Sequence, residues 1–146
     1  YVQKTFGTSF DIATYLPKVY KDLDIDIALN NFGFAPTFGS YKTKLPTSLS
    51  IGMSYPYKQW MFYEQHNIMS KHMTSGFGAS YKYQVKNEAT LLGNIGYYVD
   101  KTHNLTYPTF GLDLKYDRYL IGVSYIYGDE TLPVSNTFRL TINLEI

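Results

Sequence analysis

The sequence lacks cysteine, so a disulfide framework, a thiolate metal site and a cysteine nucleophile are all excluded among its 146 residues. It also lacks an excess of charge, because 13 lysines and arginines stand against 12 aspartates and glutamates, a net charge of +1. This balance excludes a strongly basic nucleic-acid binder and an acidic interaction tail. Nucleic acid is therefore not an expected partner.

Long apolar runs are missing as well. No window of about 18 apolar residues occurs, so the sequence predicts no transmembrane helix. Hydrophobic residues nevertheless make up 45% of the chain, which excludes a disordered protein.

The sequence is rich in tyrosine and in alternating apolar and polar residues. Tyrosine accounts for 16 residues and tryptophan for one. The alternation is clearest at the end of the chain, where the apolar positions are Phe138, Leu140, Ile142, Leu144 and Ile146. Neighbouring side chains of a strand point to opposite faces, so a period of two predicts strands with one apolar and one polar face. Because no segment keeps a period of 3.6, we expect an all-β chain.

The pattern predicts nine strands. Their approximate ranges are 8–16, 22–32, 46–56, 59–69, 75–85, 90–99, 107–117, 119–128 and 137–146. Most have about ten residues, more than is usual in soluble sheets and close to the length that a tilted membrane strand needs. The range 59–69 alternates least well, since Glu64 and His66 share a face with Trp60 and Phe62.

Short and long links alternate between these strands. The short links are 17–21, 57–58, 86–89 and 117–118, and the longer ones are 33–45, 70–74, 100–106 and 129–136. Outer-membrane barrels have this asymmetry, with short periplasmic turns and longer extracellular loops. A soluble β-sandwich or lipocalin-like barrel also has alternating strands and is the competing interpretation. The membrane barrel is favoured because the apolar faces often end in tyrosine, as in Tyr55, Tyr83, Tyr97, Tyr116, Tyr125 and Tyr127.

The predicted fold class is therefore an all-β transmembrane antiparallel up-and-down β-barrel in a bacterial outer membrane. An odd number of strands would place residue 1 on the outer side, whereas complete bacterial barrels have an even number. We therefore expect residues 1–146 to form one barrel domain that is the C-terminal portion of a larger barrel, or one of several chains that close a barrel together. The first and last strands would then need partners for their free edges.

Several phrases carry a resemblance to a known family. They are Phe10-Asp11-Ile12, Asn30-Asn31-Phe32-Gly33, Leu45-Pro46-Thr47, Ile51-Gly52-Met53-Ser54-Tyr55, Gly76-Phe77-Gly78-Ala79-Ser80-Tyr81 and Asn136-Thr137-Phe138-Arg139-Leu140. In this order they resemble the FadL superfamily of outer-membrane transporters, and more closely its PorV/PorQ-like branch. The resemblance implies a barrel of about fourteen strands, of which this chain would be the C-terminal part.

The same resemblance limits what can be inferred about function. The N-terminal hatch and the Asn-Pro-Ala phrase of the family are missing, so fatty-acid transport cannot be assigned to named residues. PorV-like members hold exported cargo, mainly through extracellular loops. The implied partners are membrane lipids and, as candidates, other subunits or secreted protein cargo.

Catalytic residues are not evident in the pattern. His66 and Glu64 are the only acid–histidine pair close together on one strand face, and such residues lie roughly 7 Å apart and point in parallel. We therefore expect no orienting contact between them, and no enzyme. His72 and His103 fall in predicted outer loops, where solvated side chains are the ordinary case.

No metal or cofactor site is expected either. Asp22, Asp24 and Asp26 have the spacing of a calcium loop, but Leu23 and Ile25 between them make this a strand face.

Charged residues fall instead on the predicted polar faces, where they would line a barrel lumen. They are Asp11, Asp24, Asp26, Lys82, Asp113, Lys115, Arg139 and Glu145. They could form a polar channel lining or an ionic network that fixes the shape of the barrel, and the mixed signs favour the network. The leading expected function is transport or secretion in the outer membrane. The alternatives are a structural membrane protein or adhesin, and a barrel lipid enzyme.

Overall fold

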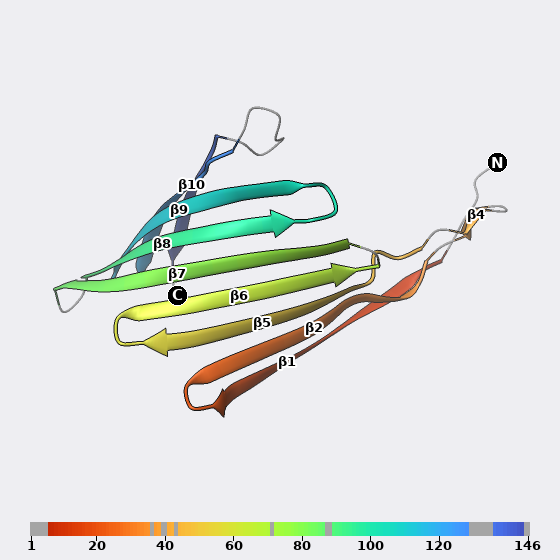
Figure 1. The fold of residues 1–146 in the computed structure, drawn as a ribbon, viewed down its shortest axis with the longest axis horizontal. Coiled ribbons are helices and arrows are strands. Elements are labelled where there is room, and N and C mark those ends of the chain that lie inside the picture. Colours follow the sequence, from red (N-terminus) through yellow and green to blue (C-terminus); the bar gives the residue numbers. More distant parts are fainter. Residues whose placement is uncertain are drawn as a thin grey trace.

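The structure is a computed structural model that describes residues 6–35, 37–38, 41–42, 44–70, 72–86, 89–128 and 136–144. This part of the chain forms one open antiparallel sheet of nine strands in the order β1-β2-β5-β6-β7-β8-β9-β10-β11 (Figure 1). The strands are β1 Thr8–Tyr20, β2 Leu23–Phe34, β5 Ser48–Tyr57, β6 Trp60–Met69, β7 His72–Lys86, β8 Ala89–Asp100, β9 Leu105–Tyr116, β10 Tyr119–Ile126 and β11 Thr137–Leu144. A separate two-stranded ribbon joins β3 (Thr37–Phe38) to β4 (Tyr41–Lys42).

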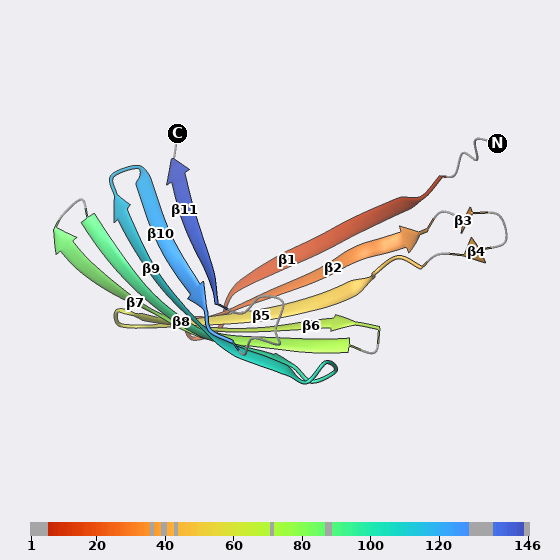
Figure 2. The ribbon, with the colours of Figure 1, turned by 90° about the horizontal axis from the view of Figure 1, so that it is seen from above.

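The all-β prediction and the count of nine main strands are confirmed, including the poorly alternating segment that forms β6. Successive strands of the sheet are neighbours throughout, which is an up-and-down arrangement. The sheet is curved, with β1 and β11 at its two edges (Figure 2). In the described part of the chain β1 pairs with β2 and β11 pairs with β10, so the sheet is not closed.

Two strand boundaries differ from the predicted ones by three residues or more. The first strand continues through Pro17 to Tyr20 because the pairing with β2 shifts register between Leu16 and Tyr20, and Lys18 there has a φ of 51°. Such a bulge lets a strand pass a proline without losing its neighbour. At the other boundary β7 begins at His72, so the link before it is shorter than the expected loop 70–74.

Tight turns join the strands at one edge of the sheet. Their first residues, Lys21, Lys58 and Asp117, have φ values of 55°, 58° and 50°. This left-handed backbone matches the twist of the strands that a two-residue hairpin connects. The opposite edge carries the longer segments that follow β2, β8 and β10, together with the turn at Ser70. We call these two sides of the sheet, where the strands begin and end, the short-link edge and the long-link edge. They are distinct from the edges formed by β1 and β11.

The pairing register places the apolar and polar residues of each strand on opposite faces. Ile27, Leu112, Val123 and Ile142 share the apolar face, and Asp26, Asp113, Ser124 and Thr141 share the polar face. Leu112 and Ile121 on the apolar face are 47% and 48% exposed, while Leu92 and Leu120 on the polar face are half-buried. Because side chains diverge on the outside of a curved sheet, we infer that the apolar face lies on the outside of the curve.

The described residues contain no buried hydrophobic side chain. The described strands of the sheet form a single layer, so no other described strand packs against the apolar face. Its exposed members on the last four strands include Ile95, Tyr97, Phe110, Leu112, Leu114, Ile121, Val123, Leu140 and Ile142.

Candidate functional site

The polar face gathers most of the residues predicted to line a lumen. Asp24 and Asp26 come from β2, Lys82 from β7, Asp113 and Lys115 from β9, and Arg139 from β11. Asp11 lies in β1 beside a register shift, and Glu145 lies outside the described residues. The role of these residues as a lumen lining stays a prediction.

Two of these aspartates, Asp24 and Asp11, hold backbone irregularities of β1 and β2 in place. The Tyr15 hydroxyl donates to Asp24 Oδ2 at 2.6 Å, and the backbone N–H of Lys18, inside the bulge, donates to Asp24 Oδ1 at 2.8 Å. At the other register shift the backbone N–H of Asn31 donates to Asp11 Oδ1 at 2.7 Å. Both carboxylates therefore satisfy N–H groups that the sheet leaves unpaired, which is a structural role.

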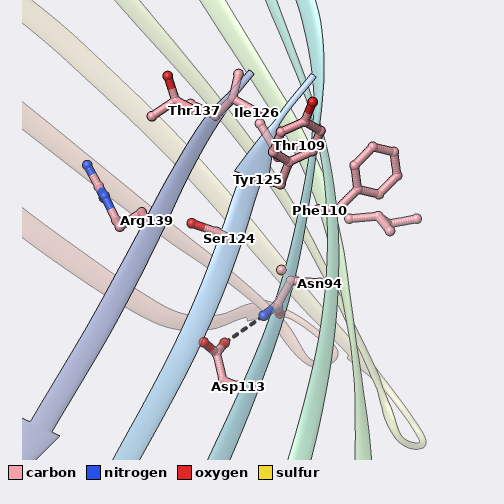
Figure 3. Close-up of a pocket in the computed structure, with 11 residues that line it drawn as sticks. Asn94, Thr109, Phe110, Asp113, Ser124, Tyr125, Ile126, Thr137 and Arg139 are labelled. Atoms are coloured by element: carbon pink, nitrogen blue, oxygen red, sulfur yellow. Dashed lines mark hydrogen bonds between the residues drawn. The ribbon is translucent and has the colours of Figure 1, made fainter. Parts of the chain in front are cut away.

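A hollow of about 370 Å³ lies further along the same face, between β8 and β11, and both polar and apolar side chains line it. Figure 3 shows Arg139, Ser124 and Asp113 on one side of the strands and Phe110 on the other. Asn94 Nδ2 donates to Asp113 Oδ2 at 2.7 Å. The hollow thus offers a guanidinium, a carboxylate and hydroxyl groups to a polar solute or to water.

Glycine makes room for these carboxylates on the neighbouring strand. Gly122 pairs with Asp113, and a Cβ at Gly122 would collide with the Asp113 carboxylate. Gly52 pairs with Asp26 in the same way, and a Cβ there would collide with the Asp26 carboxylate. The positions of these two aspartates therefore depend on a glycine across the ladder.

The apolar face carries a polar cluster, formed by Glu64 and His66 of β6 and Ser75 of β7. His66 Nε2 lies 2.8 Å from Glu64 Oε1, and His66 Nδ1 lies 2.9 Å from Ser75 Oγ. The expectation that Glu64 and His66 make no orienting contact is wrong. Their backbones are spaced as expected, but the long glutamate side chain bends along the strand and reaches the ring.

Apolar side chains surround this cluster. Ile51 pairs with His66 across β5 and β6, Val99 pairs with Ser75 across β7 and β8, and the Phe77 ring meets the imidazole edge-to-face at 6.1 Å. His66 is 23% exposed and Glu64 37% exposed, so both can be reached from outside the sheet. A shallow hollow of about 340 Å³ adjoins Glu64, and its lining includes Leu23, Met53, Tyr55, Phe62 and Phe77.

The sequence does not predict that Ser75 lies opposite His66, because the predicted link 70–74 contains too many residues. In the structure Met69 pairs with His72, and counting outward along the ladder brings Ser75 opposite His66. The sequence signal is the alternation itself, which continues back from Phe77 through Ser75 to Met73.

A third cluster lies at the long-link edge, between β7 and the end of β8. Asp100 is only 6% exposed and accepts hydrogen bonds from the backbone N–H of Thr102 at 2.9 Å and from His103 Nδ1 at 2.7 Å. The hydrogen bond from the His103 side chain is the main cause that lowers the pKa of Asp100, and the backbone donors add to it.

His72 stacks on His103, with ring centroids 5.3 Å apart. The predicted loop position of His72 is therefore wrong, since it opens β7, while His103 does lie in the link. Within the described ranges, no three histidine, aspartate or glutamate side chains are placed to hold a metal ion.

The chain was compared with protein-family models, curated proteins and solved structures, and it matches none of them. Among the residues that the structure describes, no helix is long and apolar enough to cross a membrane. Function must therefore be inferred from the two faces of the sheet.

Proposed function

We propose that the chain forms part of the wall of a bacterial outer-membrane β-barrel that acts in transport or secretion. In this proposal the apolar face meets lipid and the polar face lines an aqueous lumen. The observation that carries the proposal is the exposed apolar face of a sheet with no buried hydrophobic side chain among the described residues. A sheet in water buries one face against a second layer, and lipid supplies that layer here.

Aromatic residues on the apolar face support the same proposal. Tyr57, Trp60, Tyr81, Tyr116 and Tyr119 all lie near the short-link edge, and the Trp60 and Tyr81 rings are 4.8 Å apart. Tyrosine and tryptophan favour the boundary between hydrocarbon and water, because one end of each side chain is apolar and the other is polar. A row of tyrosine and tryptophan residues along one edge is therefore typical of a strand region that lies at a membrane interface.

The length of the strands also supports it. Seven of the nine strands of the sheet, from β1 to β9, have 10 to 15 residues. A tilted strand needs about 9–11 residues to cross the hydrocarbon. The free edges of β1 and β11 cannot face lipid unpaired, so we propose that further strands of the same protein, or of another subunit, close the barrel. The secretion-associated branch suggested by the family resemblance is one candidate, and a structural protein or adhesin is the alternative.

The orientation of the two faces can be tested in lipid vesicles. The variants Leu112→Cys and Asp113→Cys place single thiols on neighbouring residues of β9, a design helped by the absence of native cysteine from this sequence. Each variant of the full-length protein would carry an environment-sensitive fluorophore. We expect lipid-borne quenchers to act on the label at 112 and aqueous iodide to act on the label at 113.

Equal quenching of both labels by iodide would contradict the membrane assignment. Transport is tested separately by swelling of vesicles that hold the full-length protein. Uptake of small polar solutes supports a lumen that conducts. Insertion without uptake supports the structural alternative.

A further inference from the structure

We propose that Ser75, His66 and Glu64 form a hydrolytic site that cleaves carboxylic esters of fatty acyl chains at the apolar face. Ser75 is the nucleophile, His66 the general base and Glu64 the residue that orients the imidazole. The choice of a lipid ester as substrate assumes that the apolar face meets lipid, so the proposal rests on the membrane function proposed above and adds an activity to it.

The hydrogen bonds assign a role to each group. An ionised glutamate only accepts hydrogen bonds, so His66 Nε2 carries the proton that is donated to Glu64 Oε1 at 2.8 Å. His66 Nδ1 is then the unprotonated nitrogen, and it accepts from the Ser75 hydroxyl at 2.9 Å. A nucleophile hydrogen-bonded to a base that a third group orients is the arrangement by which serine hydrolases activate a hydroxyl.

The surroundings indicate the class of substrate. Met73 and Phe77, which flank Ser75 on β7, are 46% and 45% exposed, and the hollow beside Glu64 is lined mainly by apolar side chains. An acyl chain can lie along this surface, whereas a polar substrate gains no contact there. A lipid ester is therefore the substrate whose two parts match the apolar hollow and the polar cluster.

The depth of the cluster also fits a lipid ester. His66 lies three residues before the end of β6, and Ser75 lies three residues after the start of β7. At about 3.3 Å per residue, both lie roughly 10 Å from the long-link edge. Ester groups of membrane lipids lie between the head groups and the hydrocarbon, so a site near one edge of the apolar face can meet them, whereas one at its middle could not.

The reaction balances with water as the second substrate. Ser75 Oγ forms a bond to the ester carbonyl carbon while His66 Nδ1 takes the hydroxyl proton. The carbon–oxygen bond to the alcohol then breaks, and the alcohol leaves with that proton. Water adds to the acyl-serine, giving a proton to His66, and cleavage of the bond to Ser75 Oγ releases the carboxylic acid as Ser75 regains its proton.

A purely structural role for the cluster is the competing interpretation, in which the three groups only satisfy one another. Polar groups on a lipid-facing surface are costly, and apolar residues at these positions would serve a structural role at least as well. The two interpretations differ in one readout. A structural cluster affects folding alone, whereas a hydrolytic one controls the release of fatty acid.

The test uses the full-length protein in phosphatidylcholine vesicles, with the released fatty acid measured by mass spectrometry. We expect Ser75→Ala to lower release by about 10³-fold or more and Glu64→Gln by about 10²–10⁴-fold. Ser50→Ala is the matched control, because Ser50 lies on the polar face and donates to Asn67 Oδ1 at 2.7 Å instead of contacting a histidine. It should leave release unchanged.

A fluorophosphonate probe gives a second readout, because it labels only an activated serine. We expect the label on Ser75 of the unaltered protein and its loss in His66→Ala. Insertion of the Leu112→Cys label into lipid without Ser75-dependent release or labelling would overturn this proposal and leave the barrel proposal standing. Ser75-dependent cleavage of a micellar ester by a protein that does not insert would support the catalytic site and overturn the barrel.

Discussion

Neighbouring residues of β9 meet opposite surroundings. Leu112 is 47% exposed on the apolar face, whereas the Asp113 carboxylate accepts a hydrogen bond from Asn94 and lies over Gly122 of the next strand. On the apolar face large side chains such as Leu112 stay about half exposed, whereas on the polar face the Asp113 carboxylate fits against side chains and backbone of the neighbouring strands. The two faces of this sheet therefore have different tolerances to substitution, although the same strands build both.

The difference also shows where the sheet obtains its stability. The polar face holds hydrogen-bonded groups and close contacts of its own, such as Asn94 with Asp113 and Tyr15 with Asp24. The apolar face has almost no polar contacts of this kind and depends on what covers it. The Glu64–His66–Ser75 cluster is an exception, because its side chains are hydrogen-bonded on the apolar face. This exception is the reason for proposing a function for it.

The largest expected effect is on the two faces of β11. Arginine at Ile142, on the apolar face, should destabilise the folded protein in lipid by about 2–4 kcal/mol, because a charge enters the hydrocarbon. Arginine at Thr141, one residue away on the polar face, should cost far less. Urea unfolding of the two variants in phospholipid vesicles measures the difference. Equal destabilisation by Ile142→Arg and Thr141→Arg would show that the two faces are wrongly assigned.

Alternation alone is enough to assign the faces of most strands. A period of two in residues 107–117 and 137–146 fixes which side chains share a face, and the ladder needs only tight turns to keep that order. Alternation fails where a turn or a bulge changes the count. The extra residues around Lys18 lengthen the first strand, and the tight turn at Ser70 brings Ser75 opposite His66.

The contacts between side chains are the least predictable feature. Reach along a strand depends on side-chain torsions, and these are set by neighbours that the sequence does not place. The hydrogen bond between Glu64 and His66 is an example, since the backbone spacing of the two residues argues against it. Strand number and face therefore follow from pattern, while the candidate catalytic cluster emerges only from the three-dimensional arrangement.

A smaller effect is expected on the polar face, where Gly122 lies beside Asp113. Gly122→Ala should destabilise the protein by about 1–3 kcal/mol, because the new Cβ collides with the Asp113 carboxylate. Gly76→Ala is the matched control, since Gly76 lies on the same face of β7 and a Cβ there would meet no atom within 4 Å. Urea unfolding in vesicles should separate the two variants. A cost at Gly76 equal to that at Gly122 would mean that strand propensity, rather than close packing, sets the loss.

The smallest effect is expected at the long-link edge, where Asp100 holds the link to β9. Because the pKa of Asp100 is lowered from its ordinary value of 3.8, its carboxylate binds protons less readily in the folded protein than in the unfolded chain. Its contribution to stability is therefore fully present above about pH 4 and is lost as the pH falls through the lowered pKa. Hydrogen exchange at the Thr102 and His103 amides, which donate to Asp100 Oδ1 at 2.9 Å and 3.2 Å, measures that loss directly.

The corresponding variant separates the charge of Asp100 from its shape. Asp100→Asn keeps an acceptor for the two amides but removes the negative charge that pairs with His103 Nδ1 at 2.7 Å. We expect faster exchange at the two amides at pH 7 and a weaker acid dependence than in the unaltered protein. The amide of Lys82, which donates to the carbonyl of Gln59 at the short-link edge, should exchange equally in both proteins. If Asp100→Asn left the exchange of Thr102 and His103 and its acid dependence unchanged, backbone geometry would hold the link to β9. The links at the two edges would then differ only in their length.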